Sequence, residues 1–90
     1  MRESKVQTKI ISWLKKNGWF VLKIIQLSDN GYPDVYAYKE GRTVWFECKK
    51  TGVQKGEALQ EVRIDYLRKI GMEAYVVDSL EDVKKYIACK

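Results

Sequence analysis

Two short segments joined by a tight turn constrain the fold of this chain more than any other feature. Residues 34–38 and 43–49 each alternate between side-chain types, and Glu40-Gly41 between them is a two-residue hairpin signal. Pro33 lacks a backbone N–H and therefore fits the start of the first strand. The sequence predicts an antiparallel hairpin whose second strand turns Val44, Phe46 and Cys48 towards the core.

The segments on either side of the hairpin carry helical periodicity. Apolar residues at intervals of three and four predict helices over residues 3–17 and 57–70. Ser79 with Asp82 resembles a capping box, which predicts a third helix ending at about residue 88. In the second helix we expect four apolar side chains to point inward: Leu59, Val62, Tyr66 and Ile70.

Two further strands complete the expected fold. Residues 19–25 are apolar on both faces, which is typical of a central strand, and residues 74–77 form a short strand. The predicted order is α-β-β-β-α-β-α. The sequence therefore predicts an α/β fold with a mixed central sheet flanked by helices.

Length and hydropathy indicate one compact domain, spanning residues 1–90. No apolar run approaches the roughly 20 residues that span a bilayer, and the first seven residues are too polar for a signal peptide. We therefore expect an intracellular, cytoplasmic protein without a membrane partner. Cys48 and Cys89 do not have a zinc-ligand spacing.

The chain contains no histidine, and this absence excludes several classes of active site. Ser-His-Asp and Cys-His triads, His-ligated zinc and His general bases cannot be built from it. An enzyme with this sequence must use carboxylates, lysines, tyrosines or a cofactor. The formal charge of +5 favours a polyanionic partner.

Three charged side chains are predicted to meet at one end of the hairpin. Glu47 and Lys49 project from the same face of their strand because side chains alternate. If Tyr38 lies near Thr43 or Val44, the register brings Asp34 alongside Glu47 and Cys48. Two carboxylates and an ammonium group would then converge.

Such a group suits the hydrolysis of phosphodiesters. Two carboxylates, with the backbone carbonyl of Cys48 as a further ligand, can hold Mg²⁺, which prefers oxygen. The ion would offset charge in the transition state and acidify a bound water, and Lys49 could orient that water. The alternative is a solvated Glu-Lys pair, because a lone E-x-K tripeptide is common.

At this point the chain resembles the VRR-NUC (virus-type replication-repair nuclease) group of the PD-(D/E)xK nuclease superfamily. The resemblance covers nearly the whole chain and rests on these residues: Gly31-Tyr-Pro33-Asp34, Glu47-Cys-Lys49, Gln60, and Glu3 with Gln7. The chain is also similar to archaeal-type Holliday-junction resolvases, which share the restriction-endonuclease-like core. The match departs in the loop 51–57, where a Ser- or Thr-type residue is expected before Gln60.

The resemblance implies a role for each of these side chains. Asp34 and Glu47 would ligate Mg²⁺ or Mn²⁺, and Lys49 would serve the nucleophilic water. Glu3 would sit at the rim of the pocket and aid the metal, directly or through a water, and Gln60 would line the pocket. Structural explanations remain for the last two: Glu3 suits a helix N-terminus, and glutamine is usually solvated.

Basic residues around this group suggest contacts with DNA phosphates, and solubility is the alternative. We expect five of them to bind DNA: Lys50, Lys55, Arg2, Lys5 and Lys9. The resemblance implies an endonuclease that acts on branched or structured DNA and needs no nucleotide cofactor. It also suggests a protein encoded by a phage or virus. Two alternatives are a non-catalytic DNA-binding module with the same fold and a partner-binding or structural domain.

A chain of this size has little surface with which to grip DNA, so we also expect a homodimer. The candidate interface residues are aromatic side chains expected to be exposed: Tyr32, Tyr36 and Trp45.

Overall fold

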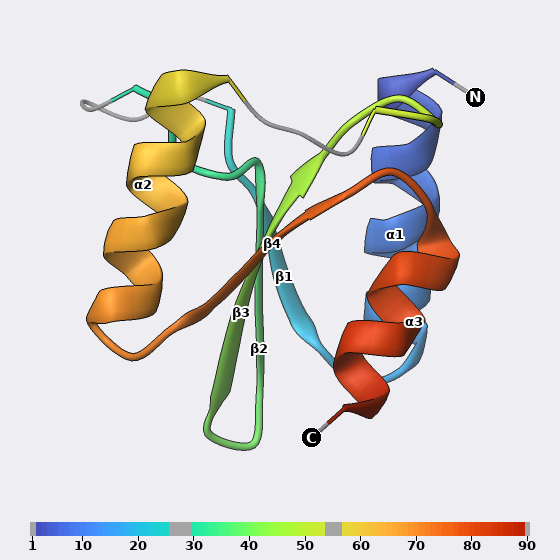
Figure 1. Cartoon of the computed structure of the whole chain (residues 1–90). Helices are drawn as coiled ribbons and strands as arrows, with labels where there is room; N and C mark the ends of the chain where they lie inside the picture. The colour runs from blue at the N-terminus through green and yellow to red at the C-terminus, as the bar shows by residue number, and fades with distance from the viewer. Residues whose placement is uncertain (1, 26–29, 54–56, 90) are drawn as a thin grey trace.

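Four strands form one sheet in the order β1-β2-β3-β4, and three helices flank it (Figure 1). The computed structural model describes residues 2–25, 30–53 and 57–89. The elements are α1 (Glu3–Lys16), β1 (Phe20–Lys23), β2 (Val35–Lys39), β3 (Arg42–Cys48), α2 (Ala58–Lys69), β4 (Glu73–Val77) and α3 (Leu80–Ala88). The strands β1, β2 and β3 form an antiparallel meander, and β4 runs parallel to β3. The predicted element order and the mixed sheet are confirmed.

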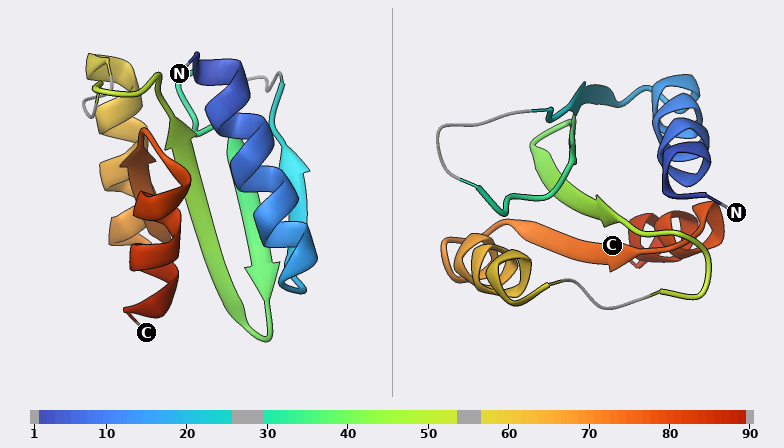
Figure 2. Two further views of the ribbon diagram at one scale, coloured as in Figure 1. Left: turned by 90° about the vertical axis from the view of Figure 1, so that its right-hand side faces the viewer. Right: turned by 90° about the horizontal axis from the view of Figure 1, so that it is seen from above.

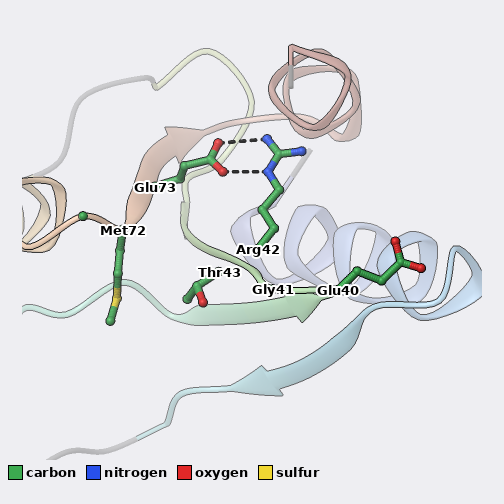
Figure 3. A pocket seen from close by; sticks show the side chains of 7 residues that line it. Glu40, Gly41, Arg42, Thr43, Met72 and Glu73 are labelled. Atoms are coloured by element: carbon green, nitrogen blue, oxygen red, sulfur yellow. Dashed lines mark hydrogen bonds and ion pairs between the residues drawn. The ribbon is translucent and has the colours of Figure 1, made fainter.

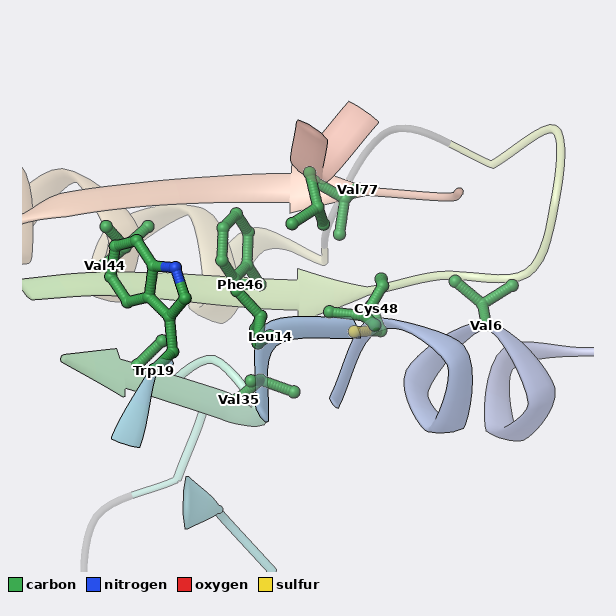
Figure 4. Close-up of a cluster of buried hydrophobic side chains, with 11 residues drawn as sticks. Val6, Leu14, Trp19, Val35, Val44, Phe46, Cys48 and Val77 are labelled. Carbon is green, nitrogen blue, oxygen red and sulfur yellow. The ribbon is translucent and has the colours of Figure 1, made fainter. Parts of the chain in front are cut away.

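The main core lies between the sheet and the helices α1 and α3, which cover the same face of the sheet (Figures 1 and 2). Val6, Ile10 and Leu14 of α1 are buried there. As predicted, β3 turns Val44, Phe46 and Cys48 into this core, and all three are fully buried (Figure 4). The alternation of β3 therefore sends its odd-numbered side chains, Glu47 among them, to the other face of the sheet.

Helix α2 packs against part of the other face of the sheet, beside β4, where a smaller apolar cluster joins Ile64 and Leu67 to Ala74. The prediction for this helix was wrong: Leu59, Val62, Tyr66 and Ile70 are 46–59% exposed. The helix has two apolar stripes, and it buries the one that contains Ile64 and Leu67. Helical spacing reveals an apolar stripe but does not identify its partner.

The prediction that the first strand is central was also wrong. Strand β1 lies at the edge of the sheet and pairs with β2 on one side. Val21 packs against the main core, but Phe20 and Leu22 are 57% and 45% exposed. The strand is apolar on both faces, although no helix among the described residues covers its second face.

A charged network closes the end of the sheet where β3 begins and β4 begins. Arg42 donates two hydrogen bonds to the carboxylate of Glu73, with lengths of 2.6 and 2.8 Å (Figure 3). The same guanidinium donates to the carbonyls of Tyr86 and Ile87 near the end of α3. These bonds join β3, β4 and α3 beside an open pocket of about 340 Å³. The network lies at the opposite end of β3 from Glu47, so it belongs to the scaffold.

Among the residues that the structure describes, no helix is long and apolar enough to cross a lipid bilayer.

Candidate active site

The hairpin register places Asp34 beside Glu47. Tyr38 pairs with Thr43 and Val35 pairs with Phe46, which is the register predicted from the sequence. One step beyond the last pair, Asp34 Oδ1 accepts a hydrogen bond of 3.0 Å from the backbone N–H of Cys48. The two carboxylates therefore lie on neighbouring strand ends and share one face of the sheet.

Gln60 of α2 bridges the other two charged groups. Its Nε2 donates to Glu47 Oε2 over 3.0 Å, and its Oε1 accepts from Lys49 Nζ over 2.8 Å. Lys49 Nζ also lies 3.5 Å from Glu47 Oε2. Because Glu47 and Lys49 expose only 5% and 13% of their side chains, these contacts fix both groups in a water-poor site.

The start of α2 holds the amide of Gln60 in this orientation. Gln60 is the third residue of the helix, and its Oε1 accepts a 3.0 Å hydrogen bond from the N–H of Glu57. Glu57 and Gln60 together form a capping box. Glu57 was missed as a functional residue in the sequence, although its Glu-x-x-Gln spacing before a helix was a usable signal.

Gly31 allows α2 to approach the segment that leads to Asp34. Its φ of +88° lies in the left-handed region, and a Cβ added there would stand 2.6 Å from Leu59 Cγ. Arg63 holds the same segment by donating to the carbonyl of Asn30 and by covering the ring of Tyr32. Helix α2 therefore positions the approach to Asp34 as well as Gln60.

The loop after Lys49 is tied to the end of β4. The N–H of Lys49 donates to the carbonyl of Val77 over 2.8 Å, and the N–H of Gly52 donates to Asp78 Oδ2 over 2.9 Å. Asp78 is 6% exposed. This second positioning residue was missed because it follows a strand far from the motif in the sequence.

The two carboxylates are held in conditions that oppose their ionisation. Burial, followed by the nearby charge of Asp34, raises the pKa of Glu47 to about 7, although Lys49 acts in the opposite direction. Burial also raises the pKa of Asp34, while the Cys48 N–H lowers it. Glu47 is buried and Asp34 is partly buried, and a cation placed between the two carboxylates would offset their mutual repulsion.

The donor set of this site fits a divalent metal ion. Asp34 and Glu47 supply hard carboxylate oxygens from adjacent strands. The ammonium group of Lys49 offsets part of their negative charge, so the net negative charge of the site is small. Among the described residues, no set of three or more Asp, Glu, His or Cys side chains is grouped closely enough to hold a metal. Further ligands would therefore be the Cys48 carbonyl, water and phosphate oxygens.

The structure distributes the other predicted residues more widely. Glu3 is exposed at the start of α1, and its charge contributes to the raised pKa values of Asp34 and Glu47. Four predicted DNA contacts are exposed: Arg2, Lys5, Lys9 and Lys50. The fifth, Lys55, lies outside the described residues. The aromatic residues expected to be exposed at an interface, Tyr32, Tyr36 and Trp45, are instead partly buried.

Comparison with known proteins identifies the fold. No family model and no curated protein sequence matches this chain. A solved structure described as "VRR_NUC domain" has a TM-score of 0.82 and 26% sequence identity, covering 96% of this chain and 94% of that chain. Another, described as "VRR_NUC domain protein", has a TM-score of 0.79 and 23% identity, covering 98% and 86% respectively.

The chain therefore has the VRR_NUC fold, which is the architecture of a nuclease-type family. The resemblance predicted from the sequence is confirmed at the level of the fold.

In the metal-free protein, Glu47→Gln is expected to raise the free energy of unfolding above that of wild type at pH 8, and to raise it much less at pH 4.5. The wild-type carboxyl has a folded-state pKa of about 7, against 4.5 ordinarily, so the folded state retains an extra proton between these values. The contribution of Glu47 to the free energy of unfolding is therefore fully present below pH 4.5. It is lost as the pH rises through 7, which lowers the free energy of unfolding of wild type by roughly 3 kcal/mol. Urea unfolding in EDTA at both pH values measures the effect. If wild type and variant lose equal stability, Glu47 is not held in a buried, charge-opposing site.

Proposed function

We propose that this protein is a divalent-metal-dependent endonuclease that hydrolyses phosphodiester bonds in branched or structured DNA. One observation carries the proposal: Asp34, Glu47 and Lys49 lie at adjacent strand ends and are joined through Gln60. The VRR_NUC fold of the chain supports the same class of reaction. Every group required is a carboxylate, an amine or an amide, so the absence of histidine is no obstacle.

Each residue has a distinct task in this proposal. Asp34 and Glu47 would hold Mg²⁺ or Mn²⁺, which when bound supplies Lewis-acid chemistry to the phosphate and to a water. Lys49 presents its ammonium group to the attacking water and to the charge that develops on the phosphate. Gln60 fixes the positions of Glu47 and Lys49 before the substrate arrives.

The exposed basic residues near this end of the molecule would bind the DNA backbone. Arg2 and Lys5 lie at the start of α1, next to Glu3, and Lys50 directly follows Lys49. Contacts of this kind recognise the phosphates and the shape of the DNA and do not distinguish one base sequence from another. Glu3 would act at the rim of the site, through water.

A cleavage assay tests the proposal directly. Linear duplex, flap and four-way-junction DNA are incubated with the protein in Mg²⁺, in Mn²⁺ or in EDTA. We expect cuts with 5′ or 3′ phosphate ends in either metal, none in EDTA, and the highest rate on a branched substrate. If the protein binds DNA but cleaves it in neither metal, it is a non-catalytic DNA-binding module. If it neither binds nor cleaves DNA, a partner-binding or structural role is favoured.

A further inference from the structure

A shallow groove follows α1 where this helix packs beside α3, on the face of the sheet opposite α2 (Figure 2). We call it the α1–α3 groove. Its volume is about 410 Å³, and it is lined by Thr8, Lys9, Ser12, Trp13, Lys16 and Leu80. Among the described residues, this lining includes two lysines and no carboxylate. The groove therefore combines apolar surface with positive charge, and none of its side chains belongs to the candidate active site.

The lysines of α1 form a stripe that leads away from the candidate active site. Lys5, Lys9 and Lys16 are spaced by four and seven residues, which places them on one side of the helix, and all three are exposed. At a rise of 1.5 Å per residue the stripe is about 17 Å long. The charge of Glu3, two residues before Lys5, helps to raise the pKa of both carboxylates of the site, so the stripe begins near them.

A smaller pocket joins the α1–α3 groove to the loop that follows Lys49. This pocket has a volume of about 130 Å³ and shares Lys9 and Leu80 with the groove. Thr51 also lines it, and Thr51 lies two residues after Lys49, which is at most about 7 Å of chain. The two adjoining hollows therefore lead from the loop beside Lys49 to Lys16.

Two carboxylates line the smaller pocket, and both have partners. Asp78 is buried and accepts a hydrogen bond of 2.9 Å from the N–H of Gly52. Glu81 Oε2 lies 4.0 Å from Lys84 Nζ. These contacts offset part of the negative charge at the entrance of the groove.

Trp13 offers an aromatic face that a cation now covers. The ring packs on one side against the main core, and Lys84 Nζ lies 5.9 Å from its centroid. The side chain of Lys84 is 47% exposed, and ion pairs and cation–π contacts at such exposed positions are weak. A flat aromatic ligand can therefore displace Lys84 from the ring, which frees the ammonium group to bind an anion.

Lysines in a row beside an aromatic side chain suit single-stranded nucleic acid. The lysines follow the phosphates, and an unpaired base stacks on the ring. A duplex would use only the lysines, because its bases are already stacked on one another. The length also fits, since about 17 Å accommodates about five nucleotides at the 3.4 Å spacing of a stacked strand.

We propose that the α1–α3 groove binds a single-stranded segment of DNA, with one base stacked on Trp13 and with Lys9 and Lys16 on its phosphates. This inference deepens the proposed function and rests on it for the identity of the strand as DNA. In a branched substrate the segment is the unpaired tail beside the bond that is cut. A flap is then a better substrate than a four-way junction, in which every arm is paired.

Fluorescence anisotropy of a labelled oligothymidylate of about ten nucleotides, titrated with the full chain in EDTA, tests the groove without cleavage. In about 0.1 M salt, Lys9→Glu and Lys16→Glu should each raise the Kd about 10-fold. Trp13→Leu should raise it about 10-fold because the base loses its stacking partner, whereas Trp13→Phe keeps a ring and should stay within about 3-fold of wild type. Circular dichroism should show equal helix content in every protein.

Lys85→Glu is the matched control, because it makes the same charge change at an exposed position of α3. Lys85 turns about 100° away from Lys84 around the helix, so we expect its variant to bind like wild type. The proposal is overturned if Lys9→Glu and Lys16→Glu bind like Lys85→Glu, or if Trp13→Leu binds like Trp13→Phe. Equal affinity of wild type for a duplex of the same length would also overturn it.

The failure of this proposal can be distinguished from the failure of the proposed nuclease activity. A protein that shows the expected differences in oligothymidylate binding, but cuts no DNA in Mg²⁺ or Mn²⁺, keeps the groove and loses the nuclease. A protein that cuts DNA, but whose groove variants bind oligothymidylate like wild type, keeps the nuclease and loses the groove.

Discussion

Replacing Lys49 with alanine is expected to lower the rate of DNA cleavage by about 10³-fold while DNA binding is retained. The ammonium group lies between Glu47 and Gln60 and is 13% exposed, so no bulk cation can take its place without rearrangement. Loss of one preorganised charge at a reacting phosphate commonly costs 10²- to 10³-fold, and loss of proton-transfer assistance adds to this. Single-turnover cleavage at saturating protein measures the chemical step alone.

The control for this prediction is Lys85→Ala. Lys85 is an exposed lysine on α3, on the other side of the sheet from α2, and its replacement removes the same charge from the protein. We expect its single-turnover rate to equal that of wild type. A Lys49→Ala protein that cleaves within a few-fold of the wild-type rate would show that the amine takes no part in the reaction.

The second large effect is expected on thermal stability. If Mg²⁺ binds the proposed site of the folded protein and not the unfolded chain, Mg²⁺ at about ten times its dissociation constant should stabilise wild type by about 1.4 kcal/mol. For a protein of this size the shift in Tm is on the order of 5–10 °C. Asp34→Asn removes one ligand charge but preserves the acceptor for the Cys48 N–H, and it should abolish the shift.

Glu81→Gln serves as the comparison for Asp34→Asn. It neutralises an exposed carboxylate at the start of α3 and should leave the Mg²⁺-dependent rise in Tm unchanged. Differential scanning fluorimetry in Mg²⁺ and in EDTA gives the two Tm values needed for each protein. An Asp34→Asn protein that keeps the whole shift would place the metal elsewhere.

The hairpin and its charged end could be predicted from the sequence because local chemistry determines them. Glu40-Gly41 fixes the turn, with φ values of +49° and +85°, and the turn fixes the register of every pair that follows. Alternation along β3 then decides that Glu47 and Lys49 share a face and that Phe46 and Cys48 are buried. The position of Asp34 beside Glu47 follows from these two facts alone.

The features that could not be predicted depend on contacts between distant segments. The sequence of β1 is apolar on both faces, but only the complete sheet shows that β1 lies at an edge. Helix α2 has two apolar stripes, and the choice between them depends on Ala74 and Trp45 of the neighbouring strands. The orientation of Gln60 likewise rests on a backbone N–H at Glu57.

The central claim is that Asp34 and Glu47 share one divalent cation. Anomalous diffraction from crystals soaked in Mn²⁺ tests it most directly, since the position of the ion is located without reference to activity. We predict one anomalous peak within about 2.3 Å of a carboxylate oxygen of each residue, a typical coordination distance for oxygen ligands. A peak bound to other residues only, or no peak at a Mn²⁺ concentration that supports cleavage, would contradict the claim.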